Sequence, residues 1–161
     1  MLNRPDPFTY RLYNYLCGMD RNSPNMVNRL CARGMNEEAL GNLDTAFQLY
    51  LEAWEIASSD DDKFTVARSL GRHQEEPHEC LYWNEQALQF ALRIDEENVR
   101  EYLSPLYLAI GKSYETLHNH SKAKQHYQLA ASFIPYLPND KYGRAVRTAV
   151  EAALIRMEFR G

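Results

Sequence analysis

The sequence predicts an all-α protein built from about three consecutive helical hairpins and a closing helix. Apolar residues recur three and four positions apart along most of the chain, and short breaks rich in Gly, Pro, Asn or Asp separate these stretches. Gly34, Gly71 and Gly111 follow one another at intervals of 37 and 40 residues, each near the end of the first helix of a predicted pair. One hairpin cannot bury its apolar face alone, so regularly spaced hairpins are expected to stack.

Composition favours a soluble protein of the cytoplasm. With 161 residues, 45% of them hydrophobic, the chain is long enough for one domain with a sizeable core. The net charge of -4 argues against general nucleic-acid binding. No apolar run approaches the roughly 18 residues of a membrane span, and the first residues lack a signal-peptide pattern. The three cysteines are widely spaced and form no disulfide framework, which fits a reducing compartment.

Residues 1–22 form an aromatic-rich N-terminal segment. Phe8, Leu12 and Leu16 are four residues apart and predict a short helix. We expect this helix to pack on the open end of the first hairpin. The alternative is a homodimer contact or a partner site, because aromatic residues are enriched in binding hot spots.

Two hairpins are predicted between residues 23 and 94. Ser23-Pro24 is a strong helix start, and Gly41-Asn42 separates the first two helices. The acidic residues 60–62 begin the third helix, where negative charge is favourable, although a metal site is an alternative interpretation. Gly34 precedes Ala46 by twelve residues, but Gly71 precedes Cys80 by only nine. A different register between the two helices of the second hairpin is therefore expected.

The third hairpin is the most regular and is predicted for residues 104–135. Gly111 and Ala123 are expected to face each other where its two helices approach most closely, since both are small. Ser121 is the expected N-cap of the second helix. The glycine intervals exceed the typical repeat of about 34 residues, so longer helices or linkers are expected to accommodate the extra residues, near residues 95–98. Residues 140–159 then alternate apolar and charged positions, which predicts a cap helix with a polar outer face.

The third hairpin resembles a tetratricopeptide repeat. This repeat carries an aromatic residue, Leu-Gly, Tyr, Ala, Phe and Pro in a set order. The matching positions here are Tyr107, Ile110, Gly111, Tyr114, Ala123, Tyr127, Ala130 and Pro135. Residues 23–160 are similar to such an array, and the resemblance implies a right-handed superhelix whose first helices line a concave groove that binds peptide segments.

If this resemblance holds, seven side chains are expected to point into the groove. They are Asn28, Met35, Arg68, Arg72, Leu108, Lys112 and Tyr142. The three cations would form a positive stripe that binds an acidic partner segment, or they would pair with nearby acids such as Glu75 and Glu115 and only keep the groove soluble.

The predicted function is that of a protein-protein interaction adaptor. A sensory or regulatory repeat domain that binds a small peptide or ligand is the alternative. No catalytic, phosphate-binding or dinucleotide-binding motif occurs, so neither an enzyme nor a cofactor is expected. His118, His120 and His126 are close in sequence but follow no metal-binding pattern, and no metal is expected.

Overall fold

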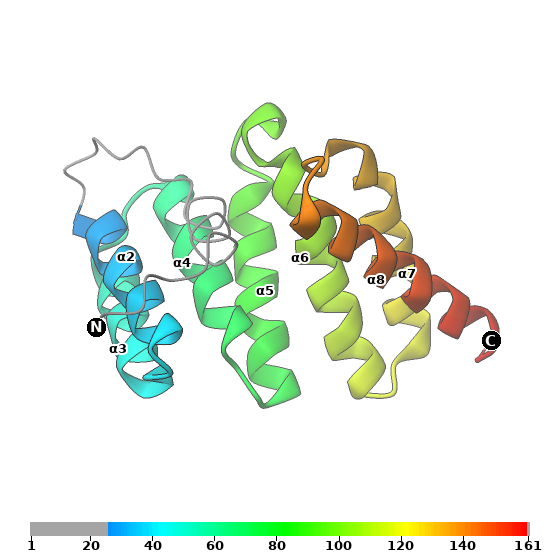
Figure 1. Ribbon diagram of the computed structural model, residues 1–161, viewed down its shortest axis with the longest axis horizontal. Coiled ribbons are helices and arrows are strands. Elements are labelled where there is room, and N and C mark those ends of the chain that lie inside the picture. The colour runs from blue at the N-terminus through cyan, green and yellow to red at the C-terminus, as the bar shows by residue number, and fades with distance from the viewer. Residues whose placement is uncertain (1–25, 161) are drawn as a thin grey trace.

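The computed structural model describes residues 26–160, which contain seven α-helices, one short 3-10 helix and no strand (Figure 1). The α-helices are α2 (Met26–Ala39), α3 (Leu43–Ile56), α4 (Asp60–Arg72), α5 (Pro77–Ala91), α6 (Glu96–Thr116), α7 (His120–Ser132) and α8 (Lys141–Glu158), and the 3-10 helix is η1 (Ile134–Tyr136). The all-α prediction is confirmed for these residues. The predictions for residues 1–22 and for a helix start at Ser23 lie outside the described part.

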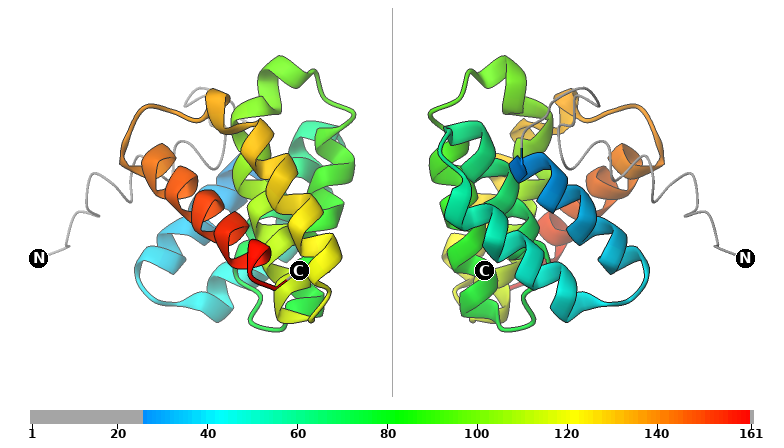
Figure 2. Two further views of the ribbon diagram at one scale, coloured as in Figure 1. Left: turned by 90° about the vertical axis from the view of Figure 1, so that its right-hand side faces the viewer. Right: turned by 90° about the vertical axis from the view of Figure 1, so that its left-hand side faces the viewer.

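Each helix packs mainly on the helices next to it in the sequence. The pairs α2–α3, α4–α5 and α6–α7 form hairpins, while α3 contacts α4 and α5 contacts α6. The last helix, α8, packs on α7 and α6 much as α4 packs on α3 and α2. The helices therefore form a row from α2 and α3 at one end to α8 at the other (Figures 1 and 2). Within residues 26–160, no helix is both long and apolar enough to cross a membrane.

Two local predictions need correction. The first helix of the third hairpin begins at Glu96 rather than near Ser104, and α6 is 21 residues long with Pro105 inside it. This longer helix accommodates the extra residues of the period. The N-cap of α7 is Asn119, whose Oδ1 accepts a hydrogen bond from the Lys122 N–H at 3.2 Å, rather than Ser121.

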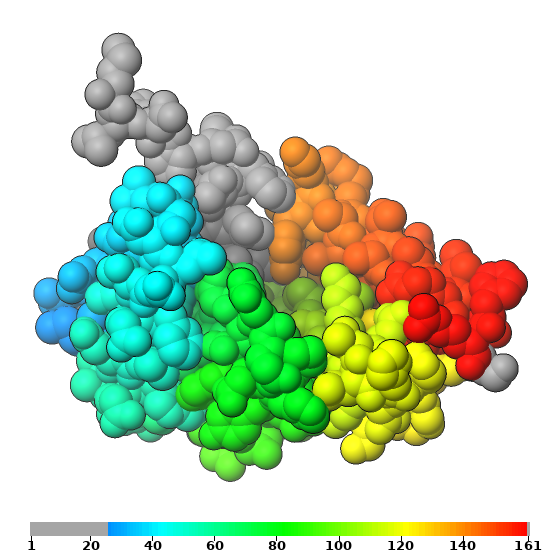
Figure 3. Space-filling model, turned by 90° about the horizontal axis from the view of Figure 1, so that it is seen from below, coloured from blue at the N-terminus to red at the C-terminus, as the bar shows by residue number. Residues whose placement is uncertain are grey.

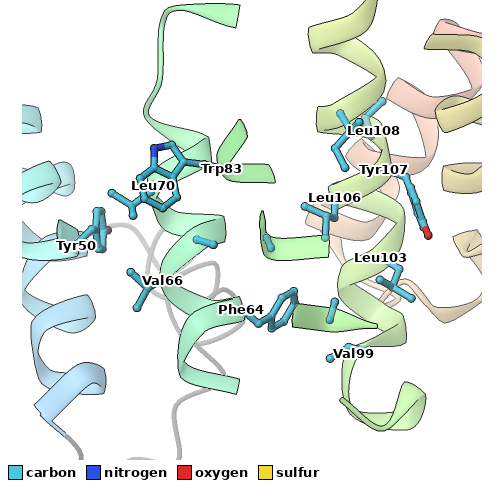
Figure 4. Packing of buried hydrophobic residues seen from close by; sticks show 14 of the residues in the cluster. Tyr50, Phe64, Val66, Leu70, Trp83, Val99, Leu103, Leu106, Tyr107 and Leu108 are labelled. Atoms are coloured by element: carbon cyan, nitrogen blue, oxygen red, sulfur yellow. The ribbon is translucent and has the colours of Figure 1, made fainter. Parts of the chain in front are cut away.

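The buried apolar side chains come from every helix and form one continuous core (Figure 4). Aromatic contacts connect the second helices of neighbouring hairpins. Trp54 of α3 makes edge-to-face contacts with Trp83 and Phe90 of α5, at centroid distances of 5.1 and 6.0 Å. Successive hairpins are therefore joined by burial of large rings as well as by aliphatic packing.

Two of the repeating glycines lie directly under tyrosine rings. A Cβ atom on Gly34 would lie 2.6 Å from Cε1 of Tyr50, and one on Gly111 would lie 2.5 Å from Cε1 of Tyr127. Both rings are fully buried. The three atoms nearest to a Cβ on Gly111 all belong to Tyr127. The glycines therefore leave room for a tyrosine ring.

Each buried tyrosine hydroxyl is bound to a glutamate that lies four residues after the glycine. Tyr50 donates a hydrogen bond to Glu38, which also accepts one from Arg72 Nη2 at 3.2 Å. His73 contacts the same carboxylate and stacks near Tyr50 at a centroid distance of 6.1 Å. Burial raises the pKa of Glu38, but the hydrogen bonds and positive charges around it outweigh this effect and lower the pKa overall. We call this group the first Tyr–Glu–Arg cluster (Glu38, Tyr50, Arg72).

The same arrangement recurs in the third hairpin. Tyr127 donates a hydrogen bond to Glu115 Oε2 at 2.6 Å, and Arg156 of α8 donates two hydrogen bonds to this carboxylate, at 3.0 and 3.2 Å. The bidentate arginine, together with the Tyr127 hydroxyl, holds the pKa of Glu115 at about 2 against a smaller opposing effect of burial. This second Tyr–Glu–Arg cluster (Glu115, Tyr127, Arg156) fixes α8 to α6 and α7, as the first fixes α4 to α2 and α3.

The middle hairpin is built differently, as the shorter spacing predicted. Its first helix ends at Arg72, one residue after Gly71, so Glu75 lies in the turn and not on the helix. Asn84 takes the place of the tyrosine, and its amide lies nearest to the position of a Cβ on Gly71. The link to the next hairpin comes from Tyr114 of α6, which donates a hydrogen bond to Glu85 of α5 at 2.7 Å. The turns within the three hairpins all lie on one side of the row, at the bottom of Figure 1, and Figure 3 shows this side from below.

Replacing Gly111 with alanine should destabilise the protein by about 1–3 kcal/mol, although alanine is the better helix former by roughly 1 kcal/mol. The reason is that the added methyl group would lie 2.5 Å from a ring that is fully buried and held by Glu115. Urea unfolding of the wild type and of Gly111→Ala measures the difference.

The control for this prediction is the same substitution in a Tyr127→Leu background. Without the ring, Gly111→Ala should become neutral or stabilising, because only the helix propensity remains. An equal effect of Gly111→Ala in both backgrounds would show that the ring is not what excludes the methyl group.

The Glu115 carboxylate should make stability depend on pH between about 4.5 and 2. Its pKa is lowered from 4.5 to about 2 in the folded protein, so its contribution is fully present above the unfolded pKa and is lost as pH falls through that range. We expect about 1–2 kcal/mol, since Arg156 is 43% exposed and solvent weakens the pair. Urea unfolding of the wild type and Glu115→Gln at pH 7, 5, 4 and 3 should show the wild-type advantage shrinking with acidity. A constant difference across this series would contradict the assignment.

Candidate functional site

A cavity of about 380 Å³ lies between the first helices of the three hairpins. It is enclosed by one turn of α2, the first two turns of α4 and the first turns of α6. Its lining residues are Asn28, Asp61, Asp62, Phe64, Thr65, Arg68, Asn98, Val99 and Tyr102. Two of the predicted groove residues, Asn28 and Arg68, are among them. The first helices thus share a recessed surface.

Arg68 is the central side chain of this cavity. It is only 9% exposed, and its Cζ lies 4.4 Å from the ring centroid of Tyr102 and 5.1 Å from that of Phe64. The two rings contact each other edge to face at 5.9 Å. Arginine is weakly hydrated and stacks on aromatic rings, so this environment stabilises a guanidinium away from bulk water. Its charge and planar donors are therefore positioned by α4 and α6 together.

Tyr142, at the start of α8, belongs to the same part of the surface. Burial raises the pKa of its hydroxyl, and the positive charges of Arg68 and Arg72 oppose this rise. The backbone before α8 packs closely against its first turn, because a Cβ on Gly143 would lie 1.9 Å from the Pro138 carbonyl oxygen. The structure therefore places Tyr142 close enough to Arg68 and Arg72 for their charges to act on its hydroxyl.

The other predicted groove residues have different environments. Met35 and Leu108 are 7% and 6% exposed and belong to the core. Arg72 is engaged in the first Tyr–Glu–Arg cluster, so its acidic partner is Glu38 rather than the expected Glu75. Lys112 is exposed on α6. The three cations therefore do not form a stripe of equivalent charges, because one is stacked on rings, one is ion-paired and one faces solvent.

Several residues of the cavity were not singled out from the sequence. Asn98 and Tyr102 lie four residues apart on the part of α6 that precedes the predicted start of the third hairpin at Ser104, and this shared face was the available signal. Asp61 and Asp62 were interpreted as favourable charges at a helix start, and they do occupy the first turn of α4 behind the Ser59 N-cap. They also give one end of the cavity a negative character.

The histidines of the third hairpin do not converge. The rings of His118 and His120 lie 6.2 Å apart, while His126 packs on Tyr114 at 5.2 Å. Among residues 26–160, no three His, Cys, Asp or Glu side chains are close enough together to bind a metal ion.

The site is therefore a partly buried arginine on an aromatic pair, with two carboxylates at one end and amide and hydroxyl groups from three helices around it. Such a surface can hold both charges and apolar groups of a ligand. Comparisons of this chain with protein-family models, with curated proteins and with solved structures found no match.

Proposed function

We propose that the chain is a cytoplasmic adaptor of the tetratricopeptide type, with its hairpins in a right-handed superhelix, and that it binds a segment of a partner protein along α2, α4, α6 and the start of α8. The observation that carries the proposal is the cavity lined exclusively, within residues 26–160, by the first helices of the hairpins. A linear segment that crosses this surface meets side chains from every hairpin in turn.

The chemistry of the cavity indicates what the segment contains. A carboxylate next to Arg68 would accept directional hydrogen bonds from the guanidinium. Phe64, Val99 and Tyr102 would contact an aliphatic or aromatic side chain beside it. Asp61 and Asp62 would favour a basic residue or an N–H donor at the far end of the cavity. The exposed Lys112 extends the positive surface toward the turns.

A second candidate is a sensory domain that binds a short peptide or a small ligand. The volume of about 380 Å³ favours it, because pockets for small ligands begin at about 300 Å³. A ligand of this kind would use Arg68 and the two aspartates alone, whereas a partner segment would also depend on Lys112 and Tyr142.

Random linear peptides selected for binding to the full chain should be enriched in sequences that pair an acidic residue with an apolar one. Replacing Arg68 with methionine keeps the stem on the rings but removes the charge, so these peptides should bind about tenfold more weakly, which corresponds to about 1.4 kcal/mol. Calorimetry or fluorescence anisotropy at low ionic strength measures the affinity.

The matched control is Arg93→Met. Arg93 also lies over a ring, with its Cζ 5.2 Å from the centroid of Phe90, but it follows α5, outside the cavity. This variant should bind the peptides normally. Equal loss in both variants, or no loss in either, would place the binding surface elsewhere. Retained binding in Lys112→Ala and Tyr142→Phe, together with loss in Arg68→Met, would favour the small-ligand alternative.

A further inference from the structure

The closing helix α8 carries a second apolar stripe on its outward side. Val146, Val150, Ala153 and Met157 are buried against α6 and α7. Nearly opposite them on the helix lies the outer stripe (Ala145, Thr148, Ala152, Ile155, Phe159), and all five of its residues are exposed. Ile155 is 55% and Phe159 85% exposed. Figure 2 (left) shows α8 facing the viewer at this end of the row.

The spacing of the outer stripe is that of a helix-helix contact. Its members alternate three and four residues apart, which is the pattern of a seam between two packed helices. A cap helix that only met water would not need large apolar residues on this side, because scattered polar residues would serve. Five aligned positions with two large hydrophobic side chains therefore indicate a surface that another helix covers.

The side-chain sizes along the outer stripe are complementary to those of an identical stripe that runs in the opposite direction. Its N-terminal half carries small side chains and its C-terminal half carries Ile155 and Phe159. If two copies of α8 pack antiparallel about a two-fold axis at Ala152, Ala145 meets Phe159 of the other copy and Thr148 meets Ile155. Each large side chain then lies over a small one, which avoids both overlap and voids.

The charges beside the outer stripe are also complementary to those of a second, antiparallel copy. Arg144, Glu151 and Glu158 lie seven residues apart on one flank, and the antiparallel arrangement brings Arg144 of each copy next to Glu158 of the other. The cations of the opposite flank, Arg156 and Arg160, are already paired with Glu115. One like-charge contact remains, because Glu151 lies nearest the axis and faces its own copy.

From this complementarity we infer that α8 is a homodimer interface, in which the outer stripes of two copies pack antiparallel about a two-fold axis at Ala152. A single pair of helices buries less area than a stable dimer needs, below about 1,200 Å², so the dimer is weak and forms at micromolar concentrations or above. This contact is separate from the cavity of the first helices and leaves it open to a ligand.

Sedimentation velocity of the full chain over a series from about 5 to 500 µM tests the inference. The wild type should shift from monomer to dimer. Ile155→Glu should remain monomeric throughout, while Leu92→Glu, which replaces a residue that is 68% exposed and lies away from α8, should dimerise like the wild type. A wild type that remains monomeric at 500 µM, or a dimer that Ile155→Glu leaves unchanged, would overturn the inference.

Charge exchange tests the direction of packing. Arg144→Glu and Glu158→Arg should each weaken the dimer several-fold, and the double variant should restore it, because the pair forms again between copies. Glu151→Gln should strengthen the dimer. Failure of the double variant to recover would exclude the antiparallel arrangement, and binding of α8 to the aromatic N-terminal segment or to a foreign helix would not produce this recovery.

Discussion

The placement of a tyrosine ring directly on a glycine organises this structure. Gly34 and Gly111 allow Tyr50 and Tyr127 to enter the narrowest part of their hairpins, where both rings are fully buried. A buried phenol requires a hydrogen-bond acceptor, and the glutamate one turn after the glycine provides it. That carboxylate in turn requires a positive charge, which comes from the first helix of the following unit. The tyrosine ring, its glutamate and the paired arginine thus connect three helices.

These linked contacts also determine which charged residue lines the cavity. Arg72 is bound to Glu38, so the arginine that lines the cavity is Arg68, one helical turn earlier. Arg68 is in turn held by rings from α4 and α6, so it depends on the spacing between neighbouring hairpins. The same contacts that stabilise the row therefore position the chemistry of its recessed face.

The middle hairpin and the closing helix show how far the arrangement tolerates change. Where α4 ends early, an asparagine replaces the tyrosine and the link between hairpins moves to Tyr114 and Glu85. At the end of the row, α8 provides the arginine for the last cluster and has no following hairpin within the described residues. Its outward side is then available for contacts of a different kind, and its residues are complementary to themselves in size and charge.

The sequence by itself determined the helices, the order of the hairpins, the positions of the glycines and the different register of the second hairpin, because these follow from local periodicity and from the residues that begin and end helices. Only the tertiary structure decided that tyrosine rings lie directly on two of the glycines, that Glu38 pairs with Arg72 across 34 residues, and that Met35 and Leu108 are buried. These outcomes depend on how far each helix is rotated and shifted against its neighbours, and a pattern that repeats every three or four residues does not contain that information.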